Sequence, residues 1–150
     1  MLLDLWRDVD IPPLWLGLCL ALVWKLGQVM PMAFPFEPII GAALILIGLV
    51  LMGAALIQML LHRTTFIPRR DPHALVTGGV FSLSRNPIYL GDALVLAGAA
   101  LWWNAPYALA LVPVFMWFLT WRYIRGEEAT IAAHFGEEYA AYRSRVRRWI

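Results

Sequence analysis

Residues 39–61 read IIGAALILIGLVLMGAALIQMLL and contain one strongly polar side chain, Gln58. A helix needs about 20 mostly apolar residues to cross the hydrocarbon core of a bilayer, so this stretch predicts a transmembrane helix. The composition agrees, because 61% of the 150 residues are hydrophobic and 15% are charged. A soluble domain typically has about 45–50% apolar and about 25% charged residues. We therefore expect one all-α domain, integral to a membrane.

Three further apolar stretches extend this prediction to a four-helix transmembrane bundle. The expected spans are residues 14–34, 39–61, 88–103 and 105–124. The third has only 16 residues before Asn104, which predicts a short or tilted span. The leading segment MLLDLWRDVD has three aspartates and one arginine, unlike the basic start of a secretory signal. We therefore expect the first span to be retained.

The distribution of basic residues predicts the orientation of the bundle. Four spans place both termini and the loop at residues 62–87 on one side of the membrane, and eleven of the twelve basic residues lie on that side, all but Lys25. Because cytoplasmic segments carry the excess of Lys and Arg, we expect a multi-pass protein with both termini in the cytoplasm. The net charge of +2 follows from this topology, and no nucleic-acid partner is expected.

Most polar residues gather in the loop at residues 62–87 and in the tail at residues 127–148. The loop mixes arginines with apolar residues and has turn signals at Asp71-Pro72 and Gly78-Gly79, which favours a position along the membrane interface. The tail predicts an amphipathic helix with a possible bend at Gly136. One helical face, with steps of three and four, comprises Ile131, Phe135, Tyr139, Tyr142, Val146 and Trp149. This helix either lies on the membrane surface or packs against the loop and closes a pocket.

The segment LSRNPIYLGD at residues 83–92 places polar groups at the start of an apolar stretch. Pro87 suits the first turn of a helix, where its missing N–H is not needed. Arg85 then lies beside the free N–H groups of that helix, an arrangement suited to an anion. Tyr89 and Asp92 share a helical face just inside the membrane. The alternative is that Arg85 anchors to lipid phosphates and pairs with Asp92.

Two motifs resemble a known family. The run LVTGGVFSLSRNPIYLG (residues 75–91), followed by EEATIAAHFGEEYAAYRSRV (residues 127–146), is similar to membrane methyltransferases related to isoprenylcysteine carboxyl methyltransferase and the phospholipid N-methyltransferases. The family pattern has Arg-His-Pro-x-Tyr-x-Gly at the start of a helix, then a Glu-Glu pair after the next span, then Phe-Gly-x-x-Tyr-x-x-Tyr. The resemblance covers roughly residues 64–150, and the matching order and spacing of several elements make it fairly specific.

The resemblance implies S-adenosylmethionine bound at the cytoplasmic end of the bundle, with an acceptor arriving through the bilayer. It implies catalytic roles for Arg85 and Glu127. The implied cofactor-binding residues are Arg85, Asn86, Pro87, Tyr89, Gly91, Glu127, Glu128, Tyr139 and Tyr142. Asn86 stands where eukaryotic members have histidine. Because asparagine forms hydrogen bonds but does not titrate, an orienting role is expected for it.

The charges of S-adenosylmethionine fit these residue types. Arg85 and the helix N-terminus suit its carboxylate, Glu127 or Glu128 its ammonium or ribose, and tyrosines its adenine or sulfonium. Methyl transfer is an in-line displacement, so the protein mainly positions two reactants and excludes water. A carboxylate acceptor needs no base, whereas an amine must first lose a proton. We therefore favour O-methylation of a carboxylate over N-methylation of an amine.

The sequence thus predicts an S-adenosylmethionine-dependent methyltransferase that acts on a membrane-embedded lipid or a prenylated acceptor. One alternative is an NADPH-dependent membrane lipid or sterol reductase, since distantly similar reductases share the carboxy-terminal helical layout. Another is a non-catalytic membrane scaffold whose tail docks on lipid. No metal site is expected, because the three histidines, His62, His73 and His134, are scattered and Cys19 is the single cysteine.

Overall fold

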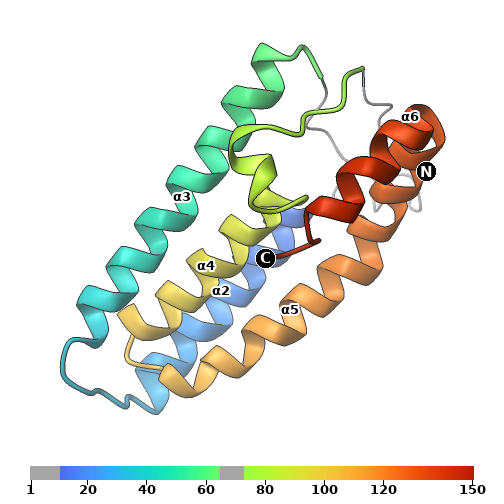
Figure 1. Ribbon diagram of the computed structural model, residues 1–150. Helices are drawn as coiled ribbons and strands as arrows, with labels where there is room; N and C mark the ends of the chain where they lie inside the picture. The colour runs from blue at the N-terminus through green and yellow to red at the C-terminus, as the bar shows by residue number, and fades with distance from the viewer. Residues whose placement is uncertain (1–10, 65–72) are drawn as a thin grey trace.

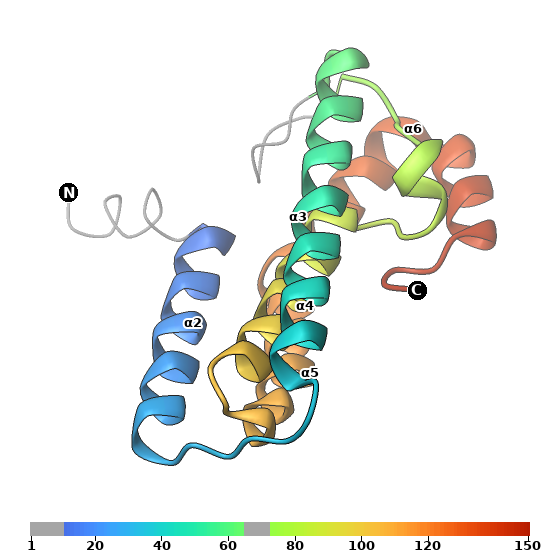
Figure 2. The same cartoon turned by 90° about the vertical axis from the view of Figure 1, so that its left-hand side faces the viewer.

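The structure, a computed structural model, describes residues 11–64 and 73–150. Helices α2, α3, α4 and α5 lie side by side, and α6 lies at one end of this bundle (Figures 1 and 2). All regular elements in the two described ranges are helical, which confirms the expected all-α class. Their bounds are α2 Pro12–Val29, α3 Glu37–Leu61, η1 Gly79–Ser82, α4 Pro87–Trp102, η2 Pro106–Ala110, α5 Leu111–Leu119, η3 Thr120–Ile124 and α6 Arg125–Arg145.

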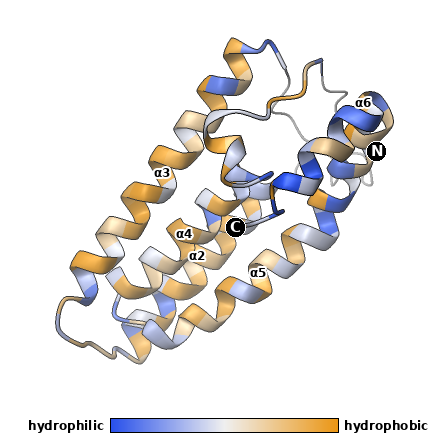
Figure 3. Ribbon diagram, in the orientation of Figure 1, coloured by the Kyte–Doolittle hydropathy of each residue, from blue (hydrophilic) through white to orange (hydrophobic). Residues whose placement is uncertain are grey.

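Three helical stretches of the described chain are long and apolar enough to cross a membrane: Pro12–Val29, Glu37–Leu61 and Pro106–Arg145. The apolar helix α4 is shorter, with 16 residues. Hydrophobic residues follow the bundle helices, whereas α6 is largely hydrophilic (Figure 3). The apolar part of the third stretch is therefore its first half, η2 and α5, and α6 extends beyond it.

Helix boundaries follow the prolines. The first helix ends at Val29, five residues before the expected boundary of its span, because Pro31 disfavours a helical conformation at the preceding residue and removes a backbone donor. The next helix begins at Glu37 with Pro38 in its first turn, where a missing N–H does no harm. At this end of the bundle the N–H of Met32 donates to the carbonyl oxygen of Asn104 at 2.8 Å, so the two connecting turns lie together.

Helix α4 lies at the centre of the bundle, and most of its residues are buried. Glycines on α3 and α4 bring the two backbones close together. A Cβ atom added at Gly48 of α3 would lie 2.7 Å from the carbonyl oxygen of Gly91, and one added at Gly98 of α4 would lie 2.5 Å from that of Gly41. Small residues permit such close crossings in membrane helices. The α3–α4 pair therefore sets the position of the first residues of α4.

Helix α6 changes direction at Gly136, which has φ 45° and ψ −116°. This confirms the bend expected at this residue. The face expected in the tail forms a small buried cluster, in which Tyr139, Tyr142 and Val146 pack with Leu75, Ile131 and Phe135. Trp149, the last member of that face, packs against the bundle core instead. The helix ends at Arg145 rather than at residue 148, and Val146, the next residue, has an extended backbone conformation.

Replacing Gly136 by alanine should destabilise the protein by about 1–3 kcal/mol, because a side chain at this positive φ is strained. Gly126, in the same helix, is the matched control. It has no positive φ and nothing lies within 4 Å of an added Cβ, so Gly126→Ala should stabilise by up to about 1 kcal/mol. Denaturant unfolding of both variants in one detergent measures the difference. Equal stabilities would contradict the strain assigned to Gly136.

Candidate functional site

A cavity of about 90 Å³ lies at the α6 end of the bundle. The end of α3, the segment before α4 and helix α6 line it, and the tail packs against the described part of the loop beside it. Six of the nine predicted cofactor-binding residues line it. The lining residues are Met59, Thr64, Ala74, Leu75, Val76, Phe81, Arg85, Asn86, Glu127, Glu128, Ile131, Phe135, Tyr139 and Tyr142.

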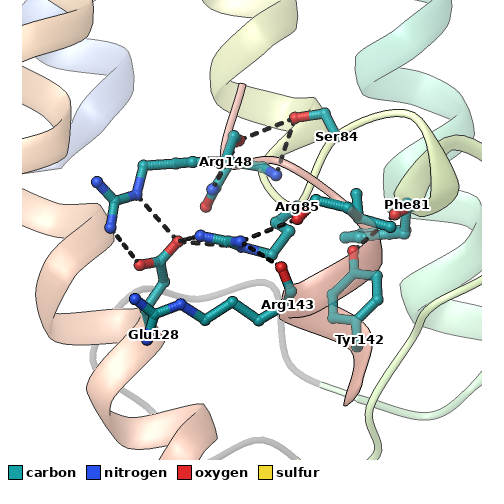
Figure 4. A network of polar contacts seen from close by, with 9 residues as sticks. Phe81, Ser84, Arg85, Glu128, Tyr142, Arg143 and Arg148 are labelled. Carbon is teal, nitrogen blue, oxygen red and sulfur yellow. Dashed lines mark hydrogen bonds and ion pairs between the residues drawn. The ribbon is translucent and has the colours of Figure 1, made fainter. Parts of the chain in front are cut away.

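One carboxylate and two guanidinium groups form an ion cluster beside this cavity (Figure 4). Arg85 Nη2 donates to Glu128 Oε1 at 2.8 Å, and Arg148 Nη2 donates to Glu128 Oε2 at 2.6 Å. The side chains of Arg85 and Glu128 are only 8% and 12% exposed. The cluster joins three segments that are distant in sequence: the start of α4, the first turn of α6 and the end of the described chain.

The protonation state of Glu128 follows from these contacts. Burial by itself would raise the pKa of Glu128, but the hydrogen bonds from Arg148 and Arg85 outweigh it and hold this pKa below its ordinary value. The hydrogen bond to Glu128 in turn raises the pKa of Arg148. Two guanidinium groups therefore face the carboxylate of Glu128, and a second carboxylate, that of Glu127, lines the same cavity.

The segment at residues 146–148 covers the N-terminus of α4. The backbone N–H of Arg85 donates to the carbonyl oxygen of Arg147 at 3.0 Å. Ser84 Oγ and Asn86 Nδ2 both donate to the carbonyl oxygen of Arg148, each at 3.1 Å. Asn86 forms no side-chain cap on α4. An anion at this helix N-terminus must therefore compete with contacts that Arg85 and Asn86 already make within the protein.

A second contact between α4 and α6 involves Tyr89, whose hydroxyl donates to Glu127 Oε1 at 2.7 Å. Tyr89 and Asp92 are both buried, and within the described residues Arg85 pairs with Glu128 rather than with Asp92. Tyr89 does not line the cavity, but this hydrogen bond connects it to Glu127, which does.

The other two predicted residues outside the lining have structural positions. Pro87 is the first residue of α4, as expected, and Gly91 packs against α3. Ser84, with no exposed surface, and Arg148 belong to the same polar cluster, although neither residue was predicted from the sequence. Arg148 is one of several arginines in the tail, and no pattern in the sequence distinguishes it from the others.

The two tyrosines of the tail differ in their hydroxyl contacts. Tyr142 Oη donates to the carbonyl oxygen of Phe81 at 2.6 Å and so ties α6 to η1. Tyr139 is 4% exposed, and its hydroxyl has no hydrogen-bond partner in the parts of the chain that the structure describes. No group of three or more His, Cys, Asp or Glu residues in those parts could hold a metal ion.

Comparison with known proteins agrees with the predicted family. The model of the phospholipid methyltransferase family matches residues 36–138. Protein-S-isoprenylcysteine O-methyltransferase B of Arabidopsis thaliana is 30% identical over 71% of this chain and 55% of its own length. The Xenopus laevis protein-S-isoprenylcysteine O-methyltransferase is 29% identical over 72% of this chain and 38% of its own length.

The Schizosaccharomyces pombe protein-S-isoprenylcysteine O-methyltransferase is 30% identical over 52% of this chain and 33% of its own length. The chain thus spans between a third and just over half of the length of these relatives. No solved structure matches it significantly. The family match includes α3, α4 and α5 and reaches both the Arg-Asn-Pro element and the Glu-Glu pair at the cavity. The chain therefore belongs to the phospholipid methyltransferase family.

Proposed function

We propose that this protein is an S-adenosylmethionine-dependent methyltransferase that acts on a membrane-embedded lipid or prenylated acceptor. The observation that carries the proposal is the contact between Arg85 and Glu128 beside a cavity at one end of an apolar bundle. Family membership supports it, because the two motifs of the family meet at this contact.

The proposed arrangement has four spans, with α4 as the short one and the cavity on the cytoplasmic side together with both termini. The exposed arginines in and beyond α6 support this orientation. These are Arg125, Arg143, Arg145 and Arg147. In this arrangement the acceptor reaches the cavity from the bilayer, and the methyl donor reaches it from the cytoplasm.

The residues around the cavity fit the donor. The guanidinium groups of Arg85 and Arg148 suit an anionic group, and the carboxylate of Glu127 suits a cationic one. The hydroxyl of Tyr139, which has no hydrogen-bond partner among the described residues, offers a further hydrogen bond. Arg85, Asn86, Glu127, Glu128, Tyr139 and Tyr142 would hold the cofactor, whose sulfonium supplies the methyl group when it is bound. Sites for small molecules typically measure about 300–1,000 Å³, so a cavity of about 90 Å³ must enlarge.

A carboxylate is the acceptor group that fits best. The named relatives are isoprenylcysteine O-methyltransferases, and transfer to a carboxylate oxygen needs no general base. The described residues then have the tasks of binding the donor, orienting it towards the bilayer side and excluding water. Arg85 and Glu127 act directly on the bound molecule, and Tyr89 positions Glu127.

Two measurements test the proposal. Isothermal titration of the purified protein with S-adenosylmethionine should give a saturable heat, and its absence at concentrations well above micromolar would contradict the proposal. Incubation with methyl-labelled donor and a membrane lipid extract should then label a lipid or prenylated product. Treatment with base should release the label as methanol, because it resides in a methyl ester. Label that resists base would show N-methylation instead.

A further inference from the structure

The hydroxyl of Tyr139 differs from the other polar groups around the cavity. It is buried and lines the cavity, yet it has no hydrogen-bond partner among the described residues. A buried polar group of this kind needs an explanation, such as a ligand or water that completes its hydrogen bonding. Tyr142, one turn further along α6, has its hydroxyl fixed by the carbonyl oxygen of Phe81 at 2.6 Å. Only one of the two tyrosines therefore has a hydroxyl available to a ligand.

The surroundings of Tyr139 determine which ligand group its hydroxyl can meet. Burial raises the pKa of Tyr139 and Glu128 raises it further, while three arginines, Arg85, Arg143 and Arg148, oppose this rise. The phenol therefore remains protonated at neutral pH and can donate a hydrogen bond. The three arginines act on this hydroxyl against one glutamate, so a negatively charged acceptor is favoured here.

We infer that the hydroxyl of Tyr139 binds the carboxylate of the methyl donor, supported by the positive charge of Arg85 and Arg148. The inference rests on the proposed function and assigns one group of the cofactor to one side chain. S-Adenosylmethionine carries a single carboxylate.

This assignment differs from one in which the N-terminus of α4 holds the carboxylate. Asn86 Nδ2 and the Arg85 backbone N–H, at that terminus, both donate to the segment at residues 146–148. Tyr139 loses no contact within the described protein when it donates to a ligand. Tyr142 must give up a short hydrogen bond to do so. Of these donors, the hydroxyl of Tyr139 is therefore the one that binds a ligand with the smallest loss of existing hydrogen bonds.

Two probes and two variants test the inference on the 150-residue chain. S-Adenosylhomocysteine carries both the ammonium and the carboxylate. Its decarboxylated analogue, 5′-(3-aminopropylthio)-5′-deoxyadenosine, keeps the ammonium and lacks only the carboxylate. Titration calorimetry of the wild type, Tyr139→Phe and Tyr142→Phe with each probe gives the affinities, and thermal melts of the ligand-free proteins give the stabilities.

Tyr139→Phe should weaken the binding of S-adenosylhomocysteine about tenfold or more, as expected for a lost hydrogen bond to a charged group. It should change the affinity for the decarboxylated analogue less than about twofold. It should leave the melting temperature unchanged or raise it, because this hydroxyl has no hydrogen-bond partner among the residues that the structure describes. Tyr142→Phe should lower the melting temperature, since the carbonyl of Phe81 loses its donor. This pattern supports the inference.

Each other pattern overturns it in a distinguishable way. Unchanged affinity of Tyr139→Phe for S-adenosylhomocysteine removes the hydroxyl from the site. Equal losses with both probes assign the hydroxyl to the ammonium or the nucleoside rather than to the carboxylate. A lower melting temperature for Tyr139→Phe shows that the hydroxyl has a structural partner. Wild-type protein that binds neither probe contradicts the proposed function itself, and the inference falls with it.

Discussion

Replacing Arg85 by alanine is expected to abolish measurable binding of S-adenosylmethionine and to lower the free energy of unfolding by about 3 kcal/mol. The guanidinium of Arg85 donates to Glu128 and to the carbonyl oxygen of Val146 at 2.9 Å. Removing it leaves a buried carboxylate with one of its two cationic partners and removes a contact that holds the segment at residues 146–148. Titration calorimetry and denaturant unfolding in the same detergent measure the two effects separately.

Arg147→Ala is the matched control for this experiment. Arg147 is exposed, and it contacts Arg85 through its backbone carbonyl, which alanine retains. Both affinity and stability should remain at wild-type values. Arg85→Lys separates charge from geometry, because lysine keeps the positive charge but lacks the planar fork that donates to two acceptors. Wild-type affinity in Arg85→Ala would remove this residue from the proposed site.

Replacing Gly98 by valine should have a comparable effect on folding, with a loss of about 3 kcal/mol or more. An added Cβ would lie 2.5 Å from the carbonyl oxygen of Gly41 and 2.8 Å from the backbone nitrogen of Ile45. Backbone atoms of a packed helix cannot rotate away as a side chain can. Helices α3 and α4 must therefore separate, and overpacking of this kind typically costs about 1–3 kcal/mol, occasionally more.

Gly53→Val is the control for the helix contact. Gly53 lies on α3, and nothing is found within 4 Å of a Cβ added there, so the same substitution should leave stability nearly unchanged. Thermal unfolding of both variants in detergent makes the comparison. Because α4 carries Arg85 at its start, Gly98→Val should also weaken cofactor binding. Equal melting temperatures for the two variants would contradict the close packing of α3 on α4.

Much of the fold could be predicted from local patterns in the sequence. The apolar run at residues 39–61 corresponds to α3 within two residues, and Pro87 begins α4 as its position in the sequence suggests. Each of these features depends on residues close together in the chain. The apolar face of the tail could also be predicted from the spacing of its residues, and five of its six members form one cluster in the structure.

The details of the candidate site depend on contacts between distant segments, and these could not be predicted. Nothing in the sequence shows that Arg148, rather than a neighbouring arginine, pairs with Glu128. The π-helical turn η3 at Thr120–Ile124 could not be predicted from the sequence either. Such a turn alters which residues of the following helix face the bundle. The different roles of Tyr139 and Tyr142 appear only once the position of Phe81 is known.

The length of α4 bears on how a lipid acceptor would be handled. Its 16 residues extend about 24 Å at 1.5 Å per residue, against a hydrocarbon core about 30 Å thick. In the four-span arrangement proposed above, Arg85 therefore lies below the level of the lipid phosphates. Polar groups that bind to Arg85 are then held close to the hydrocarbon core. A lipid substrate could then reach the methyl donor while it remains in its leaflet. Its hydrocarbon tail would stay out of water, so the free-energy cost of exposing that tail would be avoided.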